Sequence, residues 1–434
     1  MYYVGIDVSK HFHVAFVIDE NEKIVSSVTF DNNLDGFKKF LNVLENIDKD
    51  LNRFSVALEA TGIYFENLFL FLKNKFAKLI LINPFISNKF REFSNMNKSK
   101  TDKIDAINIA KLIKNNTIIS SNVNEEFLSE MKYLNRFKLE KQKLLKTYKV
   151  QLSELIYVVF PEIENVFKNL FTKTSLLILK HYPTAYHFKK TTPKKLLKLS
   201  KSIKGSNFNE EKAKKLISLA KNSIYQGNAL KTREMIVKNL IEHIEKLNDE
   251  IDSIEKELES LLNNFNSLNS DNQTKNNSND NNYSKCNKNN DNNSNSLIDN
   301  LFSIPGISDK TVITVLSEAG DLNRFKNAKK FIGFIGLFPE ITQSGKFNKS
   351  KSISKKGNRK IKTAFYQAAV AAIRYNPEMK KLQLDLISKG RTKKEANVIV
   401  ARKLAHIFYS IYKHNKPYNP ERVFKPDYLC ENKK

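Results

Sequence analysis

The stretch that decides the fold is Tyr2-Tyr3-Val4-Gly5-Ile6-Asp7-Val8-Ser9-Lys10, at the start of the chain. Its apolar residues predict a buried strand, yet Asp7 lies inside it. A carboxylate on a buried strand costs several kcal/mol unless something compensates its charge. Where several carboxylates gather, a divalent metal ion is the usual partner.

Three further acids are placed to join Asp7. Glu59 ends a second apolar strand, 54–59, and Asp102 and Asp105 open a predicted helix. Because they are three residues apart, Asp102 and Asp105 share one helix face.

A purely structural alternative accounts for part of this pattern. Thr101 or Asp102 as a helix N-cap, with Asp105 as a favourable first-turn charge, explains the Asp pair as well as a metal does. It explains neither Asp7 nor Glu59. Oxygen ligands favour Mg²⁺ or Mn²⁺, and two such ions about 4 Å apart serve phosphoryl displacement. The predicted metal ligands are Asp7, Glu59, Asp102 and Asp105.

The order of elements predicts an α/β domain over residues 1–118. Three short strands are followed by alternating helices and strands, which is the order of a ribonuclease-H-like domain. The predicted strands cover 2–8, 12–18, 23–30, 53–59 and 77–82, and the predicted helices cover 34–48, 63–74 and 102–114.

The next region, 119–265, is predicted to be helical. One long helix runs over 128–160 and stops at Pro161. A second carries an apolar seam with steps of three and four, typical of a coiled coil. Its partner is either the 128–160 helix or a second protomer, and we favour a contribution to dimerisation. The seam consists of Val237, Leu240, Ile244, Leu247, Ile251, Ile254, Leu258, Leu261 and Phe265.

Two segments complete the chain. Residues 266–297 are rich in Asn, Ser, Asp and Lys and are predicted to be a disordered insert without chemistry. A mainly helical domain over 298–434 begins with a Pro305-Gly306 turn and a helix at 309–319. This start is similar to half of a helix-hairpin-helix, in which backbone N–H groups meet a phosphate, but an ordinary turn explains it equally well.

The net charge of +27 on 434 residues predicts a polyanionic partner, most commonly nucleic acid. Residues 341–403 hold seventeen Lys and Arg against three acids, a net +14. A lysine-rich protein from an AT-rich genome is the alternative, but the clustering is too local for it. Cys286 and Cys430 suit neither a disulfide framework nor a zinc site. With no signal peptide and no apolar run of membrane-spanning length, we expect a cytoplasmic protein.

A second candidate site consists of Ser344 and the basic segment that follows it. Gly345 and Gly357 suggest loops that approach a ligand closely. A solvated basic loop is the alternative, and Ser344 by itself is typical of a turn. Eight basic residues without an acid would hold phosphates: Lys346, Lys349, Lys351, Lys355, Lys356, Arg359, Lys360 and Lys362.

Several motifs together resemble one transposase family. Gly5-Ile6-Asp7-Val8-Ser9-Lys10, Leu58-Glu59-Ala60-Thr61-Gly62 and Lys100–Ala106 resemble the DEDD signature of the insertion-sequence-110 family, which includes the Piv-type DNA invertases. The later motifs fall in the family's order: Ile304-Pro305-Gly306-Ile307, Gly336-Leu337-Phe338-Pro339, Ser344-Gly345, Ile353–Arg359 and Ala401-Arg402-Lys403-Leu404-Ala405. The resemblance covers nearly the whole chain except the Asn-rich insert.

The resemblance implies a RuvC-like N-terminal domain that holds Mg²⁺ through the four acids and a C-terminal domain that supplies Ser344 as nucleophile. It further implies a coiled coil that mediates oligomerisation, as a dimer or as a tetramer at synapsis. Its implied partners are donor and target DNA and a structured bridge RNA that pairs with both. Such a protein would be prokaryotic and associated with the nucleoid.

The resulting hypothesis is a site-specific recombinase in which Ser344 attacks a phosphate assisted by Mg²⁺. Because the acids and Ser344 belong to separate domains, a composite site is expected. Two other functions remain open: a RuvC-like endonuclease or junction resolvase that uses water, and a nucleic-acid-binding protein without enzymatic activity. The stretch Lys346-Phe347-Asn348 holds less glycine than is common in the family. Nearby rivals for the nucleophile are Ser350, Ser352 and Ser354.

Overall fold

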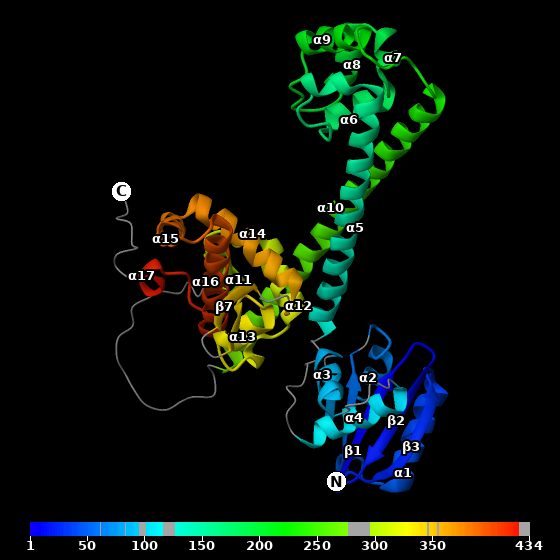
Figure 1. Cartoon of the computed structure of the whole chain (residues 1–434), viewed down its shortest axis with the longest axis vertical. Helices are drawn as coiled ribbons and strands as arrows, with labels where there is room; N and C mark the ends of the chain where they lie inside the picture. The colour runs from blue at the N-terminus through cyan, green and yellow to red at the C-terminus, as the bar shows by residue number, and fades with distance from the viewer. Residues whose placement is uncertain are drawn as a thin grey trace. The chain divides into compact units, whose positions relative to one another are not determined.

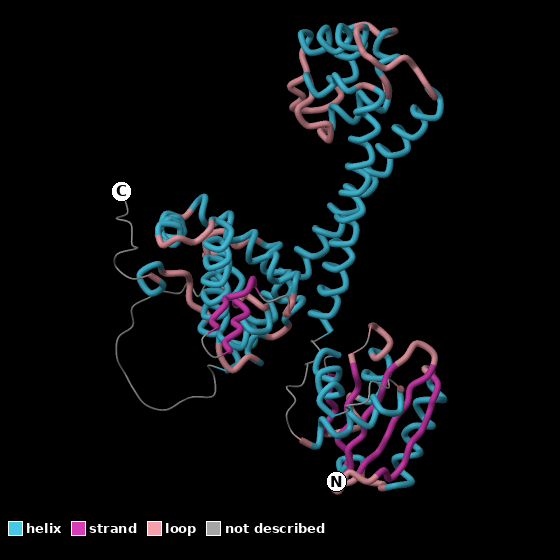
Figure 2. The backbone as a smooth tube through the Cα atoms, in the orientation of Figure 1, coloured by secondary structure: helices cyan, strands magenta, loops and turns pink. Residues whose placement is uncertain are grey.

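The computed structural model describes residues 1–60, 62–82, 84–94, 101–115, 126–276, 296–344, 347–353 and 356–424. The chain forms two compact units, Met1–Asn124 and Glu125–Lys434. Figures 1 and 2 show a sheet with covering helices in the first unit and a mainly helical second unit. Within the described ranges, no helix has the length and apolarity needed to cross a membrane.

A five-stranded sheet is the centre of the first unit. Its order is β3-β2-β1-β4-β5, with β1, β2 and β3 antiparallel and β1, β4 and β5 parallel. The predicted strands and the predicted helices are all present, with ends that shift by up to three residues. The elements are β1 (Tyr2–Val8), β2 (Phe12–Ile18), β3 (Ile24–Asp31), α1 (Leu34–Ile47), β4 (Phe54–Glu59), α2 (Glu66–Leu72), β5 (Lys78–Ile82), α3 (Pro84–Ser94) and α4 (Asp102–Lys114).

Helix α3 was not predicted from the sequence. Pro84 follows the predicted strand 77–82 and is a signal for its end, but proline is also well suited to the first turn of a helix, where its missing N–H costs nothing. Here Pro84 both ends the connection from β5 and begins α3.

The helices cover both faces of the sheet. On one face, α1 and α2 pack Phe40 and Leu72 against strand residues such as Ile6. On the other, Ile109 of α4 packs against Ala57 and neighbouring apolar residues. Alternation along β1 places Val4, Ile6 and Val8 toward α1 and α2, and therefore turns Gly5 and Asp7 toward α4.

Gly5 allows α4 to lie directly on β1. A Cβ at this position would lie 2.1 Å from the carbonyl oxygen of Ala106 and 2.4 Å from the amide nitrogen of Ala110. Only a residue without a side chain permits this approach. The far end of α4 is held by ion pairs from Lys111 and Lys114 to Glu22, at 3.1 and 3.0 Å.

The second unit is built on a long helical hairpin. Helix α5 (Glu126–Val159) packs along α10 (Leu230–Asn276). The two helices are antiparallel, because Lys138 pairs with Glu255 at 3.9 Å and Lys141 with Glu250 at 2.7 Å. Short helices between them form the tip of the hairpin (Figure 1): η2 (Pro161–Asn165), α6 (Lys173–His181), α7 (Ala185–Lys189), α8 (Pro193–Lys201) and α9 (Glu210–Lys221).

The apolar seam of α10 is buried within the single chain. All nine predicted seam residues are buried except Leu261, which is half-buried, and the neighbouring Ile241 and Leu262 are buried as well. Helix α5 is the main element packed against α10. Of the two partners considered, the structure therefore selects the intramolecular helix, and the seam needs no second protomer for its burial.

The Asn-rich insert begins later than predicted. Helix α10 continues past Phe265 to Asn276, so the predicted boundary at residue 266 is too early. A helix already nucleated can extend over polar residues, since each added residue gains a backbone hydrogen bond. Residues 277–295 lie outside the described part of the chain.

The remainder of the second unit is a helical domain with one β-hairpin. Phe331, Phe365 and Phe408 are fully buried at its core, and α12 also packs on α5. The hairpin was not predicted from the sequence. The elements are α11 (Leu297–Phe302), α12 (Asp309–Ala319), η3 (Leu322–Arg324), α13 (Ala328–Ile335), β6 (Pro339–Ser344), β7 (Phe347–Ile353), α14 (Arg359–Tyr375), α15 (Pro377–Ser388), α16 (Lys393–His414) and α17 (Pro420–Val423).

Candidate functional site

Asp7 and Glu59 lie at the ends of adjacent parallel strands. The register of β1 and β4 pairs Gly5 with Ala57 and Ile6 with Leu58. Asp7 is therefore the next residue of β1, and Glu59 is the next residue of β4. Alternation turns both of them to the side that α4 covers. Each is half-buried. The carboxyl ends of parallel strands are where ligand sites of such sheets form.

The first turn of α4 brings the other two acids to this edge. Thr101, not Asp102, is the N-cap, because its hydroxyl oxygen accepts a hydrogen bond from the Ile104 N–H at 3.3 Å. Of the two N-cap candidates, Thr101 is therefore the cap, and Asp102 and Asp105 both lie in the first turn, as the structural alternative expects. Asp102 is exposed and Asp105 is half-buried.

The four acids interact electrostatically. Burial and, after it, the charges of Glu59, Asp102 and Asp105 together raise the pKa of Asp7 from 3.8 to about 7, although a hydrogen bond from the Val8 N–H lowers it. Like charges this close disfavour ionisation of one another. The site therefore concentrates negative charge around a half-buried carboxyl group.

A divalent cation fits the chemistry of this group. All four side chains offer carboxylate oxygens, the ligands that Mg²⁺ and Mn²⁺ prefer. In the described residues, no group of three or more His, Cys, Asp or Glu side chains is arranged so that it could hold a metal ion. A metal ion would have to draw the carboxylates inward as it offsets their repulsion.

Ser344 lies at the tip of a hairpin rather than in an irregular loop. It is the last residue of β6 and pairs with Phe347 across the turn. Side chains between 339 and 355 lie outside the described part of the chain, as do the backbones of Gly345, Lys346, Ser354 and Lys355. Lys349 and Lys351, predicted in a loop, belong to β7 together with Ser350 and Ser352.

At the base of this hairpin, the chain segments at Gly336 and Gly357 pass close to each other. A Cβ on Gly336 would lie 2.0 Å from the Lys356 carbonyl oxygen, and one on Gly357 would lie 2.5 Å from the Ile335 carbonyl oxygen. Both have positive φ, +83° and +94°. Gly357 was predicted to approach a ligand, but its close approach is to the chain at Gly336. The crossing holds the two ends of the Ser344 hairpin together.

Four of the eight predicted phosphate-binding residues have side chains in the described part of the chain. Lys356 and Arg359 are exposed. Lys360 instead donates to Glu318 at 2.9 Å. Lys362 donates to the Lys356 carbonyl oxygen at 3.2 Å, and burial lowers its pKa. The last two residues therefore have structural partners within the domain, which their sequence neighbourhood did not reveal.

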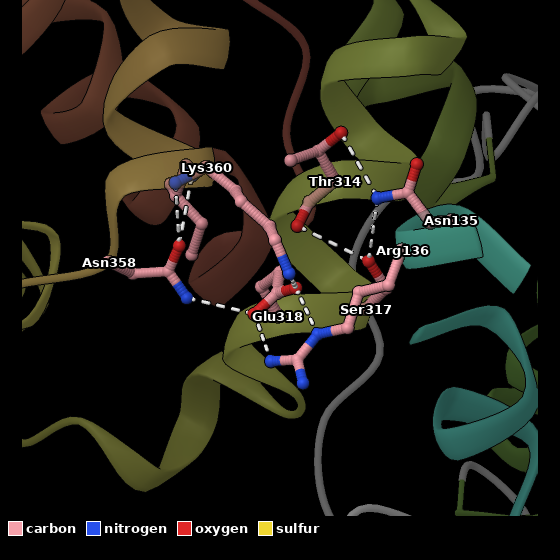
Figure 3. A network of polar contacts seen from close by, with 8 residues as sticks. Asn135, Arg136, Thr314, Ser317, Glu318, Asn358 and Lys360 are labelled. Carbon is pink, nitrogen blue, oxygen red and sulfur yellow. Dashed lines mark hydrogen bonds and ion pairs between the residues drawn. The ribbon is translucent and has the colours of Figure 1, made fainter. Parts of the chain in front are cut away.

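A buried ionic network around Glu318 explains the position of Lys360 (Figure 3). The Glu318 side chain is 2% exposed. Arg136 of α5 donates to both of its oxygens, at 2.8 and 2.9 Å. Asn358, the N-cap of α14, donates to it at 3.0 Å. The network joins α5, α12 and the start of α14, directly after the Ser344 hairpin.

Electrostatics confirm that Glu318 is satisfied. Burial alone would raise the pKa of Glu318, but hydrogen bonds from Arg136, Lys360 and Asn358 outweigh it and lower the pKa from 4.5 to about 2. No sequence signal marked Glu318 or Arg136, since they are 182 residues apart.

The turn at Gly306 also serves packing. A Cβ there would lie 2.4 Å from the Ala368 carbonyl oxygen and 2.6 Å from the Ala372 amide nitrogen, both in α14. The glycine predicted to approach a phosphate therefore lies against a helix of its own domain. Of the two alternatives for this motif, the structural turn accounts for Gly306.

A basic cavity of about 840 Å³ lies beside the C-terminal part of α16. Its lining includes Lys403, His406, His414, Lys416 and Arg422 and no acidic side chain. The sequence motif around Lys403 carries no predicted role of its own. Here Lys403 donates to the Val423 carbonyl oxygen at 2.7 Å, and thus ties α17 to α16.

Comparisons with known proteins match regions in both units. A family model described as "Transposase", for DEDD transposases of the IS110 group, matches residues 4–161, and a model of the "Transposase IS116/IS110/IS902 family" matches residues 298–383. The first match includes all four acids, and the second includes Ser344.

Curated relatives share the first region. The chain is 34% identical over 122 residues to a pilin gene-inverting protein of Moraxella bovis, covering 27% of this chain and 38% of the relative. It is 30% identical over 119 residues to the transposase for insertion sequence element IS1111A of Coxiella burnetii, covering 27% and 33%. The matches thus span little more than a third of these relatives. Together with the two family models, they show that residues 4–161 and 298–383 are similar to transposases of the IS110 family.

Proposed function

We propose that this protein is a DNA transposase or site-specific recombinase that cuts and rejoins strands through Ser344 and a metal-binding carboxylate site. The observation that carries the proposal is the position of Asp7, whose half-buried carboxyl group lies among three other acids. A protein that only bound nucleic acid would gain nothing from concentrated negative charge facing a polyanion. The sheet order β3-β2-β1-β4-β5 supports a RuvC-like description of this domain.

The four carboxylates would hold Mg²⁺, with Mn²⁺ as a substitute. When bound, the ion would offset negative charge on the scissile phosphate. The protein's own contribution is placement. Gly5 lets α4 lie against β1 and Thr101 caps its first turn, which would bring Asp102 and Asp105 toward Asp7.

Ser344 is the proposed nucleophile. Its hydroxyl oxygen would bond to phosphorus as the bond to the leaving strand oxygen breaks. The serine proton passes to solvent, and the departing oxygen takes up a proton. The phosphoserine ester keeps the bond energy, so a strand hydroxyl can later reverse the attack and rejoin DNA. The exposed Lys356 and Arg359, with the basic residues of the hairpin, would hold flanking phosphates.

We further propose a structured guide RNA and donor and target DNA as partners, with sequence read by base pairing and the protein contacting backbone. The net charge of +27 supports a polyanionic partner. An oligomer is part of the proposal, since strand exchange needs two cut sites. Because the α10 seam is buried by α5, the protomers would have to associate through another surface.

The test is a search for a covalent protein–DNA adduct on a denaturing gel. Purified protein is incubated with element-flanking RNA, Mg²⁺ and labelled donor and target DNA. We expect an adduct that is lost in Ser344→Ala and in Asp7→Asn. It should persist in Ser350→Ala and Ser352→Ala, which are matched serine controls on the facing strand.

The alternatives give distinct outcomes. Cleavage without an adduct, unchanged in Ser344→Ala but lost in Asp7→Asn, would identify a hydrolytic RuvC-like nuclease. An adduct that survives Ser344→Ala would assign the nucleophile to another residue. Equal behaviour of wild type and Asp7→Asn would remove the carboxylate site from the mechanism.

A further inference from the structure

The tip of the helical hairpin is strongly basic and has no assigned role. Residues 161–229 hold fourteen lysines against four glutamates, a net +10. All but the first of these residues lie outside the two regions that the family models match. A binding site for an anion also requires a cavity with suitably placed donor groups.

A cavity of about 380 Å³ in the tip meets this requirement. It lies between the segment that joins α7 to α8 and one face of α9. Among its lining residues, all in the described part of the chain, none is acidic. They are Lys189, Thr191, Thr192, Pro193, Lys214, Ile217, Ser218 and Lys221.

Thr191 provides the observation that points to a ligand. Its residue is only 9% exposed, and its hydroxyl oxygen is buried without a hydrogen-bond partner. A buried hydroxyl that lacks a partner costs about 1–3 kcal/mol relative to a satisfied one. Thr191 lines the cavity, but its hydroxyl oxygen is closed to solvent, so a ligand with acceptor oxygens would remove this cost once the Thr191 side chain turns toward the cavity.

The start of α8 supplies a second set of donors. Thr192 is its N-cap, but the Thr192 side chain accepts no hydrogen bond from the first turn. The N-terminus of a helix carries partial positive charge and attracts anions. Lys189 and Lys221 stand on the cavity wall, and Lys214 joins them while pairing with Glu210 at 2.8 Å on the surface.

We propose that this cavity binds a backbone phosphate of a nucleic acid strand. Thr191 would donate its hydroxyl hydrogen to a phosphate oxygen, the start of α8 would face the same group, and Lys189 and Lys221 would offset its charge. The chemistry is shared by RNA and DNA. The site lies on the hairpin tip and uses neither the four acids nor Ser344, so it goes beyond the proposed strand chemistry.

The test measures binding of the full-length protein to labelled double-stranded DNA and to labelled structured RNA in EDTA at several salt concentrations. We expect Thr191→Val, which removes the hydroxyl at constant shape, to weaken binding of one polymer by about 5-fold or more. Lys189→Gln with Lys221→Gln should weaken it for every sequence. This double variant should also lower the slope of log affinity against log salt by about 1 for each phosphate that the protein no longer neutralises.

Lys168→Gln with Lys173→Gln is the matched control, because it removes the same charge from exposed positions of the tip outside the cavity. It should have little effect at 0.15 M salt, where charges more than about 8 Å away are screened. If this control weakens binding as much as the cavity pair, diffuse charge suffices and the proposal is wrong.

Thr191→Val separates the remaining outcomes. Unchanged binding to both polymers, with an unchanged or raised melting temperature, would mean that the hydroxyl has no ligand and would overturn the proposal. A second outcome would also overturn it: inorganic phosphate stabilises the wild type while all variants bind both polymers equally. That result would indicate a site for free phosphate. The polymer whose affinity falls identifies the ligand as RNA or DNA. Binding in EDTA does not depend on strand cleavage, so failure of the proposed chemistry is seen separately in the adduct assay.

Discussion

Asp7 carries its charge on the face of the sheet where burial and three neighbouring acids oppose ionisation. In the absence of metal, this arrangement costs stability. We therefore expect Asp7→Asn to stabilise the protein in EDTA by on the order of 1 kcal/mol, a rise of a few degrees in the unfolding temperature. The same variant should lose any stabilisation by Mg²⁺ or Mn²⁺.

Differential scanning calorimetry with and without Mg²⁺ measures both effects. Glu45→Gln, which removes an exposed acid from α1, is the control and should behave as the wild type. A variant Asp7→Asn that is less stable than the wild type in EDTA would contradict the repulsion described for this site.

Glu318 shows the opposite situation, a buried carboxylate stabilised by its partners. Its pKa is about 2 in the fold against 4.5 ordinarily. Because the folded value is the lower one, the contribution is fully present above about pH 4.5 and is lost as the pH falls toward 2. Glu318→Gln should lower the free energy of unfolding at pH 7 by roughly 3 kcal/mol, since Arg136 and Lys360 lose their counter-charge.

Urea denaturation of wild type and Glu318→Gln from pH 7 to pH 3 tests this. The difference between the two should shrink below pH 4.5. Glu210→Gln breaks an exposed ion pair with Lys214 and should cause no measurable change. A difference that is constant across the pH range would show that the carboxylate charge is not what stabilises the network.

At the scale of elements, the contact of α4 with β1 places two acids of the site. Gly5→Ala would put a methyl group 2.1 Å from the Ala106 carbonyl oxygen, so α4 must move away from the sheet. We expect a loss of about 3 kcal/mol in unfolding free energy and a loss of metal-dependent activity, because Asp102 and Asp105 move with the helix.

Gly333→Ala is the matched control for this prediction. Gly333 lies in α13 with nothing within 4 Å of an added Cβ, so alanine should be neutral or stabilise by about 0.5–1 kcal/mol. Chemical denaturation and strand cleavage measured on both variants decide the point. Full activity in Gly5→Ala would mean that the position of α4 does not matter for the site.

At the scale of the whole molecule, the helical hairpin is stable within one chain. Leu258 is fully buried in it, whereas Met235, on the same helix, is 64% exposed. Leu258→Ala should therefore cost about 2–5 kcal/mol at every protein concentration, and Met235→Ala should cost little. A seam that was buried only by dimerisation would instead give a midpoint that rises with protein concentration. Denaturation at two widely separated concentrations distinguishes these cases.

Much of the fold followed from the sequence alone. Apolar strands with turn residues between them predicted the five strands, and the helical periodicity predicted α1, α4, α5 and α10, because these patterns are local. The sequence also predicted Asp7, Glu59, Asp102 and Asp105 as one metal site, which stays a prediction; the structure shows that the other three acids raise the pKa of Asp7. Helix α3 was not predicted, because Pro84 can either end a strand or begin a helix. The hairpin β6–β7 was not predicted, because its polar sequence shows no alternation of apolar residues.

Only the tertiary structure decided how the long-range pairs form. The sequence showed a seam on α10 but not that α5 buries it, and a lysine at position 360 but not that Glu318 binds it. It marked Gly306 and Gly357 without showing that each lies against the backbone of its own domain. The physical reason is the same in each case. Periodicity and turn preference depend on neighbours in the chain, whereas burial, ion pairing and close backbone approach depend on residues far away in sequence.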